Sequence, residues 1–62
     1  MENIERLEAL AGAIFRLSED IAFNHSACLS PNKAAALRAR KATLALEKAC
    51  KEYRKLSIEA FK

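Results

Sequence analysis

A single proline divides this 62-residue sequence into two long segments that no other proline interrupts. Because proline inside a helix removes a backbone hydrogen bond and clashes with the preceding turn, one helix cannot run through Pro31. The sequence contains one glycine, and β-branched residues are few, so both segments favour helix over strand. These features predict an all-α protein with two helices in a single domain that spans residues 1–62.

The first segment has the apolar spacing of a helix that packs against a partner. Its larger apolar residues recur in steps of three and four, at Leu7, Leu10, Ile14, Leu17 and Ile21. This spacing predicts one apolar stripe on a helix over residues 3–23, followed by a break at residues 24–30. Gly12 lies inside this helix and costs about 1 kcal/mol relative to alanine, unless a close contact needs the space.

The second segment predicts a longer helix. Ser30 is expected to cap it, and Pro31 occupies the first helical position, where a missing N–H is harmless. Nothing later in the chain interrupts this helix, which we expect over residues 31–61 with a length of about 45 Å. One broad face of it carries alanines early and larger residues later, at Leu46, Tyr53 and Leu56. A short connection between two helices favours an antiparallel hairpin.

A hairpin of this size leaves apolar surface uncovered, since so short a chain buries only about 60% of the surface that its unfolded form exposes. Leu37, Leu44 and Ile58 would face water in a monomer, which indicates that another subunit covers part of the second helix. We therefore expect a homodimer with a four-helix arrangement. The residues expected in its core or subunit contact are Leu7, Leu10, Ile14, Leu17, Ile21, Leu46, Tyr53 and Leu56, with Phe15 and Phe23 in the same role.

Positive charge is concentrated in the second helix. Nine of the eleven Lys and Arg residues lie at or after Lys33, so residues 31–62 carry a net charge of +6 and residues 1–30 a net charge of −3. Four lysines recur every seven residues, about 10 Å apart, at Lys41, Lys48, Lys55 and Lys62. Such a row on a rigid helix is what a polyanion such as duplex DNA meets first. The alternative is a cationic face that only keeps the helix soluble.

The second half also resembles a known family. The block Asn32-Lys33-Ala34-Ala35-Ala36, followed by Leu46-Glu47-Lys48, Tyr53-Arg54-Lys55 and Ser57-Ile58, is similar to the N-terminal domain of the linker-histone-like nucleoid proteins of chlamydiae and their short bacterial relatives. The resemblance implies a small helical protein that binds double-stranded DNA with little sequence preference in a bacterial nucleoid. It points to Lys33, Arg38, Arg40, Lys48, Lys51, Arg54 and Lys55, and the lysine row adds Lys41 and Lys62.

One departure from that family keeps a second function open. Its chlamydial members continue into a long lysine- and alanine-rich tail, which the resemblance implies carries most of their DNA affinity. This 62-residue sequence contains no such segment. The rival hypothesis is therefore a helical dimerisation or protein-interaction module that does not bind DNA.

Other function classes have little support in the sequence. His25 and Cys28 are too few for a zinc site, and they lack the third group that would orient a nucleophile pair. Cys50 lies on the apolar face, where a small hydrophobe is ordinary. Spaced rather than continuous apolar residues exclude a membrane span, and the alanine-rich face lacks the tryptophan of a membrane-surface helix. We expect no catalytic residue, metal, cofactor, small-molecule substrate or membrane partner, and a location in the cytoplasm at the nucleoid.

Overall fold

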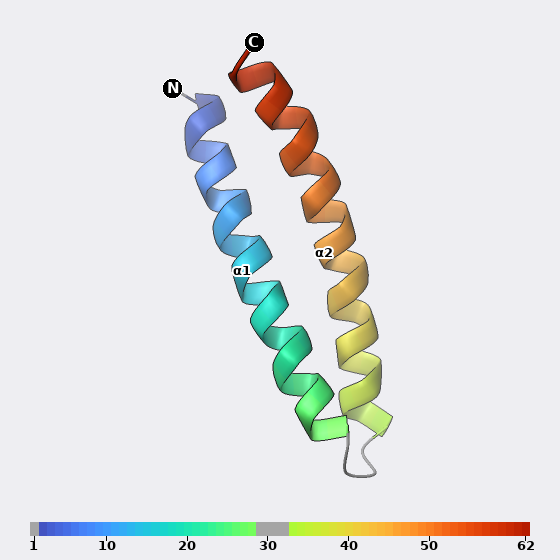
Figure 1. Cartoon of the computed structure of the whole chain (residues 1–62). Helices are drawn as coiled ribbons and strands as arrows, with labels where there is room; N and C mark the ends of the chain where they lie inside the picture. The colour runs from blue at the N-terminus through green and yellow to red at the C-terminus, as the bar shows by residue number, and fades with distance from the viewer. Residues whose placement is uncertain (1, 29–32) are drawn as a thin grey trace.

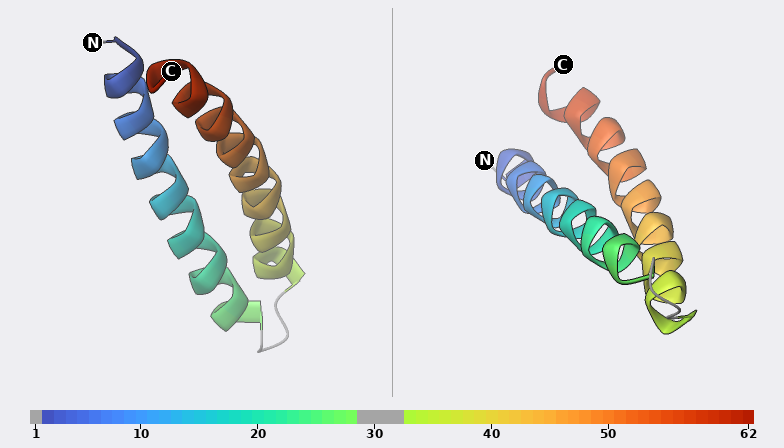
Figure 2. Two further views of the ribbon diagram at one scale, coloured as in Figure 1. Left: turned by 45° about the horizontal axis from the view of Figure 1, so that its top comes forward. Right: turned by 60° about the horizontal axis from the view of Figure 1, so that its bottom comes forward.

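A computed structural model of the chain contains two α-helices and describes residues 2–28 and 33–62. Helix α1 spans Glu2–Cys28 and helix α2 spans Lys33–Ala60. The helices run side by side in opposite directions, so that the start of α1 and the end of α2 lie at the same end of the molecule (Figure 1 and Figure 2). The predicted all-α antiparallel hairpin is confirmed.

The hairpin is a rod rather than a sphere. Its Cα atoms extend over 48 × 14 × 11 Å, and their radius of gyration is 14.2 Å. A compact domain of the same length would have a radius of gyration of about 11 Å. The two helices therefore form a single layer, and each of them has one neighbour and one long outer side.

Helix α1 continues further than the sequence pattern predicts. The expected break begins at Asn24, but residues 24–28 are helical and α1 has 27 residues against 28 in α2. The side chain of Asn24 explains the difference, because its amide nitrogen donates to the Asp20 carbonyl at 2.8 Å and its oxygen accepts from Arg38 Nε at 3.0 Å. Both polar groups of this side chain are satisfied in the helix, so no turn is needed. His25 accordingly lies in the last turn of α1 and not in a linker.

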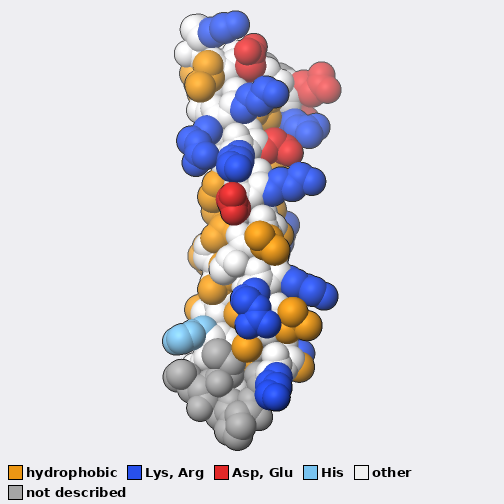
Figure 3. Space-filling view, turned by 90° about the vertical axis from the view of Figure 1, so that its right-hand side faces the viewer, with side chains coloured by type: hydrophobic (Ala, Val, Ile, Leu, Met, Phe, Trp, Pro, Cys, Tyr) orange, Lys and Arg blue, Asp and Glu red, His pale blue; other side chains and the backbone are white. Residues whose placement is uncertain are grey.

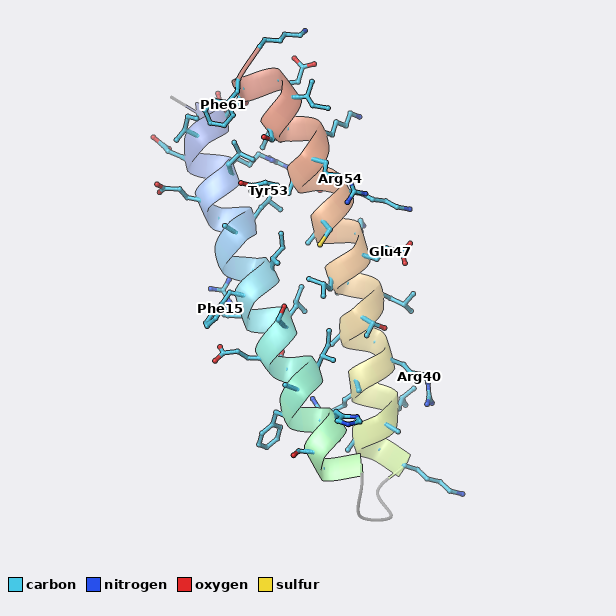
Figure 4. All side chains as sticks on the ribbon, viewed as in Figure 1. Phe15, Arg40, Glu47, Tyr53, Arg54 and Phe61 are labelled. Atoms are coloured by element: carbon cyan, nitrogen blue, oxygen red, sulfur yellow. The ribbon has the colours of Figure 1, made fainter. Side chains whose placement is uncertain are left out.

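Helix α2 is one unbroken helix over its described length, as the sequence predicts. It ends one residue before the expected limit, and the Phe61 N–H still donates to the Ser57 carbonyl at 3.0 Å. The predicted cap at Ser30 and the start at Pro31 lie outside the described residues. The side chain of Tyr53 points towards α1, whereas Phe61 lies near the N-terminal end of α1 (Figure 4).

The seam between the helices is thin. Leu7, Ala35 and Ala42 are the buried apolar residues of the described chain, with exposed fractions of 6%, 0% and 9%. The remaining seam residues are half-buried, among them Leu10, Ile14, Leu17, Ile21, Leu46 and Leu56. Alanine contributes little apolar area, and no large side chain in the described part is fully buried. The hairpin therefore gains less from burial than its apolar content allows.

Two aromatic residues, Phe15 and Phe23, lie outside the core in which the sequence allows them. Phe15 and Phe23 retain 64% and 74% of their exposure, so they are not part of the core of the hairpin. Phe15 points away from α2 in Figure 4. The helical repeat places both on the outer half of α1, which α2 does not cover. Of the two roles expected for them, contact with another subunit is the one that the fold leaves open.

Candidate nucleic-acid interface

The outer side of α2 carries parallel rows of side chains at seven-residue spacing. Three of its lysines form one row, Lys41, Lys48 and Lys55, whereas Lys62, the fourth member of the predicted row, follows the end of α2. A second row contains Lys33, Arg40, Glu47 and Arg54. Arg40, Glu47 and Arg54 point away from α1 (Figure 4). Figure 3 looks onto this side of the molecule and shows Lys and Arg side chains along its whole described length. All nine cations predicted to contact DNA are exposed.

The lysine row of α2 forms no ion pair within the described chain. The ion pairs found there join Arg6 to Glu52, Lys51 to Glu47 and Lys62 to Glu59. None of them involves Lys41, Lys48 or Lys55. These three ammonium groups extend into solvent over about 20 Å of helix. Their full charge is available to an anionic partner.

Two predicted cations are partly neutralised by neighbours on the same helix. The Lys51 and Glu47 side chains approach to 3.4 Å at the i,i+4 spacing of one helix. Lys62 lies 3.6 Å from Glu59. Exposed pairs of this kind contribute a few tenths of a kcal/mol. Phosphate can displace either glutamate, but each pair reduces the local positive potential.

Arg38 differs from the other cations, because it is tied to the seam. Its Nε donates to the Asn24 side chain at 3.0 Å, and Asn24 is itself buried, with 8% exposure. This link joins the two helices near the connection. Sequence reasoning placed Asn24 in a loop and missed this contact. The signal was present, since Asn24 continues the seven-residue repeat of Leu10 and Leu17.

A second link between the helices lies towards the other end of the rod. Arg6 Nη2 approaches Glu52 Oε2 at 3.4 Å, and both side chains are partly exposed. One of the two cations in the acidic half is thereby paired with one of the three acids in the basic half. The outer side of α1 keeps Glu2, Glu5, Glu8 and Glu19 exposed. Negative and positive potential therefore lie on opposite edges of the hairpin.

Apolar side chains interrupt the cationic surface of α2. Leu37, Leu44 and Ile58 have exposed fractions of 45%, 67% and 68%. They form a row with Lys51 between the lysine row and the arginine-containing row, and hydrophobic side chains lie among the cations in Figure 3. The expectation that they face water in an isolated hairpin is confirmed.

Groups that would support other chemistry are not assembled in the described residues. No cluster of three or more His, Cys, Asp or Glu side chains there has the arrangement of a metal site. Neither of the two helices is long and apolar enough to cross a membrane. Cys50 is half-buried and carries a free thiol.

These features define a class of protein: a small, basic, all-helical hairpin whose exposed Lys and Arg side chains lie mainly on the outer side of α2. The family model described as histone H1-like protein Hc1 matches residues 1–62, and the chain belongs to this family. The match is wider than residues 32–58, which carry the resemblance noted in the sequence. Comparison with curated proteins and with solved structures gave no significant match. Membership makes the chain a histone-like DNA-binding nucleoid protein of a structural and not an enzymatic family.

Proposed function

We propose that this protein binds duplex DNA without sequence preference through the outer side of α2, and that it does so as a homodimer. The observation that carries the proposal is the exposed row of Lys41, Lys48 and Lys55, in which no described carboxylate pairs with a lysine. Lys33, Arg40 and Arg54 flank it, whereas Lys51 and Lys62 contribute after release from their glutamates. Arg38 contributes least, because its guanidinium is held by Asn24.

Binding of this kind draws its free energy from phosphates. Each Lys or Arg that neutralises a phosphate releases condensed counterions, so log affinity falls with log salt by about 0.9 per contact. From Lys33 to Lys55 the exposed cations of α2 span about 33 Å, close to one turn of duplex. A straight helix can therefore approach a phosphate strand at several places, without entering a groove.

The residue types on α2 disfavour reading of base sequence. Helix α2 contains no Asn or Gln, the side chains that pair with adenine in two hydrogen bonds. Lysine contacts position a protein on the phosphate backbone but carry no sequence information. We therefore expect unrelated duplexes to bind with similar affinity.

The thin seam supports the homodimer. Three buried apolar residues, two of them alanine, are few for a domain that lacks disulfides and metal in its described part. Small domains with so little core are commonly stabilised by oligomerisation. The exposed Phe15 and Phe23 are further apolar area that a second subunit can cover.

A fluorescence titration with two unrelated duplexes at several salt concentrations tests DNA binding. The variant Lys41→Gln/Lys48→Gln removes two charges from the row, and the matched control Arg6→Gln/Arg16→Gln removes two charges from α1. We expect the first to reduce the salt slope by about 1.8 and the control to leave it nearly unchanged. If both variants weaken DNA binding equally, the proposal is contradicted, because the net charge of the protein would then explain binding without the lysine row.

The rival function is a helical interaction module, which the exposed Leu37, Leu44 and Ile58 favour. Absence of duplex binding by the full chain at low salt, with the dimer intact in sedimentation, would establish this alternative.

A further inference from the structure

The two broad sides of the hairpin differ sharply in charge. On one side, which we call the uncharged face, the rows Ile4, Ala11, Ser18 and Ala36, Thr43, Cys50, Ser57 contain no Asp, Glu, Lys or Arg. A groove on this face is lined by Ile4, Leu7, Ala11, Tyr53 and Phe61 and by one charged residue, Glu8, which lies outside these rows. The opposite side, the charged face, carries the Arg6–Glu52 ion pair, and its groove is lined by Arg6, Glu52, Lys55, Leu56 and Glu59.

The side chains of the uncharged face suit contact with another helix. Ala11, Thr43 and Cys50 are small, so a second helix backbone can approach closely. Phe15 and Phe61 border the face and retain 64% and 69% exposure, and Tyr53 retains 36%. Aromatic side chains are enriched in subunit contacts relative to the rest of a protein surface.

The surface area of the chain indicates how much of it a partner covers. The accessible surface is 4918 Å². A compact monomer of 6.9 kDa exposes about 4,000 Å², so the hairpin exposes about 900 Å² more than its mass predicts. A stable dimer interface buries about 800 Å² on each partner. The excess therefore matches one interface between two copies.

We propose that the uncharged face packs against the same face of a second copy, and that α1 of each copy lies on α2 of the other. Two hairpins stacked face to face by a two-fold axis have two possible arrangements. Either α2 lies on α2 of the partner, or it lies on α1 of the partner. The first brings two segments of net charge +6 together, whereas the second places +6 beside −3. Charge complementarity selects the second arrangement.

The position of each residue along the long axis of the hairpin, its level, identifies which residues meet at the rim, the outer edge of the contact between the two copies. The Arg6–Glu52 and Arg38–Asn24 links show that residues of α1 and α2 lie at the same level when their numbers add to about 60. In the selected arrangement the axis runs along the rod, so levels are preserved between copies. Glu8 then lies near Arg54 of the partner subunit, and Glu19 near Arg40 of the partner subunit. Neither Arg40 nor Arg54 has an ion pair within its own described chain.

In this arrangement some cations of α2 contact the partner subunit and others bind DNA. The second role rests on the proposed DNA binding. Arg40 and Arg54 complete the rim of the dimer. The row of Lys41, Lys48 and Lys55 faces away from the partner. Leu37, Leu44 and Ile58 also stay outside this contact, so the proposed dimer does not cover the residues from which the sequence predicts a second subunit. Because the two α2 helices lie at diagonal corners of the bundle, the two lysine rows lie on opposite flanks, about 20 Å apart. One dimer therefore presents two separate duplex-binding surfaces and bridges two DNA segments.

Charge placed on each face tests which side forms the dimer. Ala11 lies on the uncharged face and Ala45 on the charged face, and both are exposed in the hairpin. Glu has a helix propensity close to that of Ala, so Ala11→Glu and Ala45→Glu leave α1 and α2 intact, which circular dichroism checks. We expect Ala11→Glu to raise the dimer dissociation constant in sedimentation at least about tenfold, because it buries an unpaired carboxylate. We expect Ala45→Glu to retain the dimer. A dimer unaffected by Ala11→Glu overturns the proposal.

Disulfide formation tests the arrangement without relying on an unfolding-prone variant. In a Cys28→Ser background, Ala11→Cys lies opposite Cys50 of the partner subunit in the proposed dimer. Thr43→Cys lies opposite that residue in the rejected arrangement, where levels are inverted about the middle of the rod. We expect mild oxidation to give a covalent dimer of Ala11→Cys and not of Thr43→Cys. The reverse result refutes the placement of α1 on α2 of the partner. If neither variant gives a covalent dimer, the uncharged face is not the subunit contact.

A two-colour assay separates failure of this inference from failure of DNA binding. Duplexes labelled with donor and acceptor dyes are expected to show energy transfer with the wild-type chain and to lose it with Ala11→Glu, while each duplex still binds. Loss of all duplex binding with intact disulfide results would remove the DNA function but keep the dimer. Binding without energy transfer in the wild type would contradict the bridging arrangement.

Discussion

Replacing Asn24 by alanine should destabilise the hairpin, because this side chain links the two helices. Its oxygen accepts from Arg38 Nε at 3.0 Å, and its amide nitrogen donates to the Asp20 carbonyl at 2.8 Å. A hydrogen bond to a charged group contributes about 1.5–3 kcal/mol, and the exposure of Arg38 favours the lower value. The local bond adds about 0.5 kcal/mol, whereas the higher helix propensity of alanine offsets about 0.6 kcal/mol. The expected loss in the free energy of unfolding is about 1.4 kcal/mol.

Thermal unfolding followed by circular dichroism measures this loss, at one fixed protein concentration because a dimer's Tm depends on it. We expect a fall in Tm of about 6–11 °C. The matched control is Ser18→Ala. The Ser18 hydroxyl also donates to the carbonyl four residues earlier, at 2.9 Å, but that hydrogen bond stays within α1. Its removal should change the free energy of unfolding by no more than about 0.5 kcal/mol.

A double-mutant cycle with Arg38→Ala isolates the contact between the helices. We expect a coupling free energy of about 1 kcal/mol between Asn24 and Arg38. A coupling below about 0.3 kcal/mol would refute the stabilising link. The same variant bears on function, because Arg38 is held at the seam and Lys48 is not. Arg38→Ala should therefore reduce the salt slope of DNA binding less than Lys48→Ala does, and equal reductions would count against this division of roles.

Two further substitutions test the outer sides of the helices. A Cβ added at Gly12 would meet Arg16 Nη1 at an ordinary contact distance of 3.5 Å and no other described neighbour. Gly12→Ala should therefore raise the free energy of unfolding, measured by urea titration, by up to about 1 kcal/mol. A lower free energy of unfolding would show that a partner packs against Gly12. Leu44 is 67% exposed and faces outward in the proposed dimer, so Leu44→Gln should leave the dimer dissociation constant in sedimentation within about twofold. Loss of the dimer would instead place the subunit contact on the outer side of α2.

The helices and their pairing follow from local sequence, but the length of α1 does not. Apolar spacing locates both helices, and the lysine row follows from the repeat of one helix, as does the Lys51–Glu47 pair. The polar residues after Phe23 look like a turn when only local preferences are considered. The contact of Asn24 with Arg38 reverses that preference, and it depends on how the two helices are aligned. Single-helix patterns cannot supply this alignment.

The same reason limits what the sequence says about the core and the site. The sequence predicts Phe15 and Phe23 in the core or in a subunit contact, because large aromatic side chains are usually buried. With one neighbouring helix, however, α1 can bury only one stripe of side chains, which contains Leu7, and Phe15 and Phe23 lie outside that stripe. The Arg6–Glu52 pair was missed for want of the same alignment. The assignment of individual cations to DNA remains a prediction, because each exposed lysine satisfies the pattern equally well.

The alanine-rich seam connects stability to DNA binding. Ala35 and Ala42 are buried, so α2 lies close to α1 there, but each methyl group contributes only about 0.8 kcal/mol of burial free energy. In the proposed dimer, a hairpin held mainly by such residues gains much of its stability from the second copy, and its folded fraction then depends on protein concentration. The lysine row keeps its spacing only while α2 is helical, since the seven-residue repeat aligns the lysines on no other backbone. Dimerisation, folding and the presentation of paired cationic surfaces should therefore rise together as the protein accumulates.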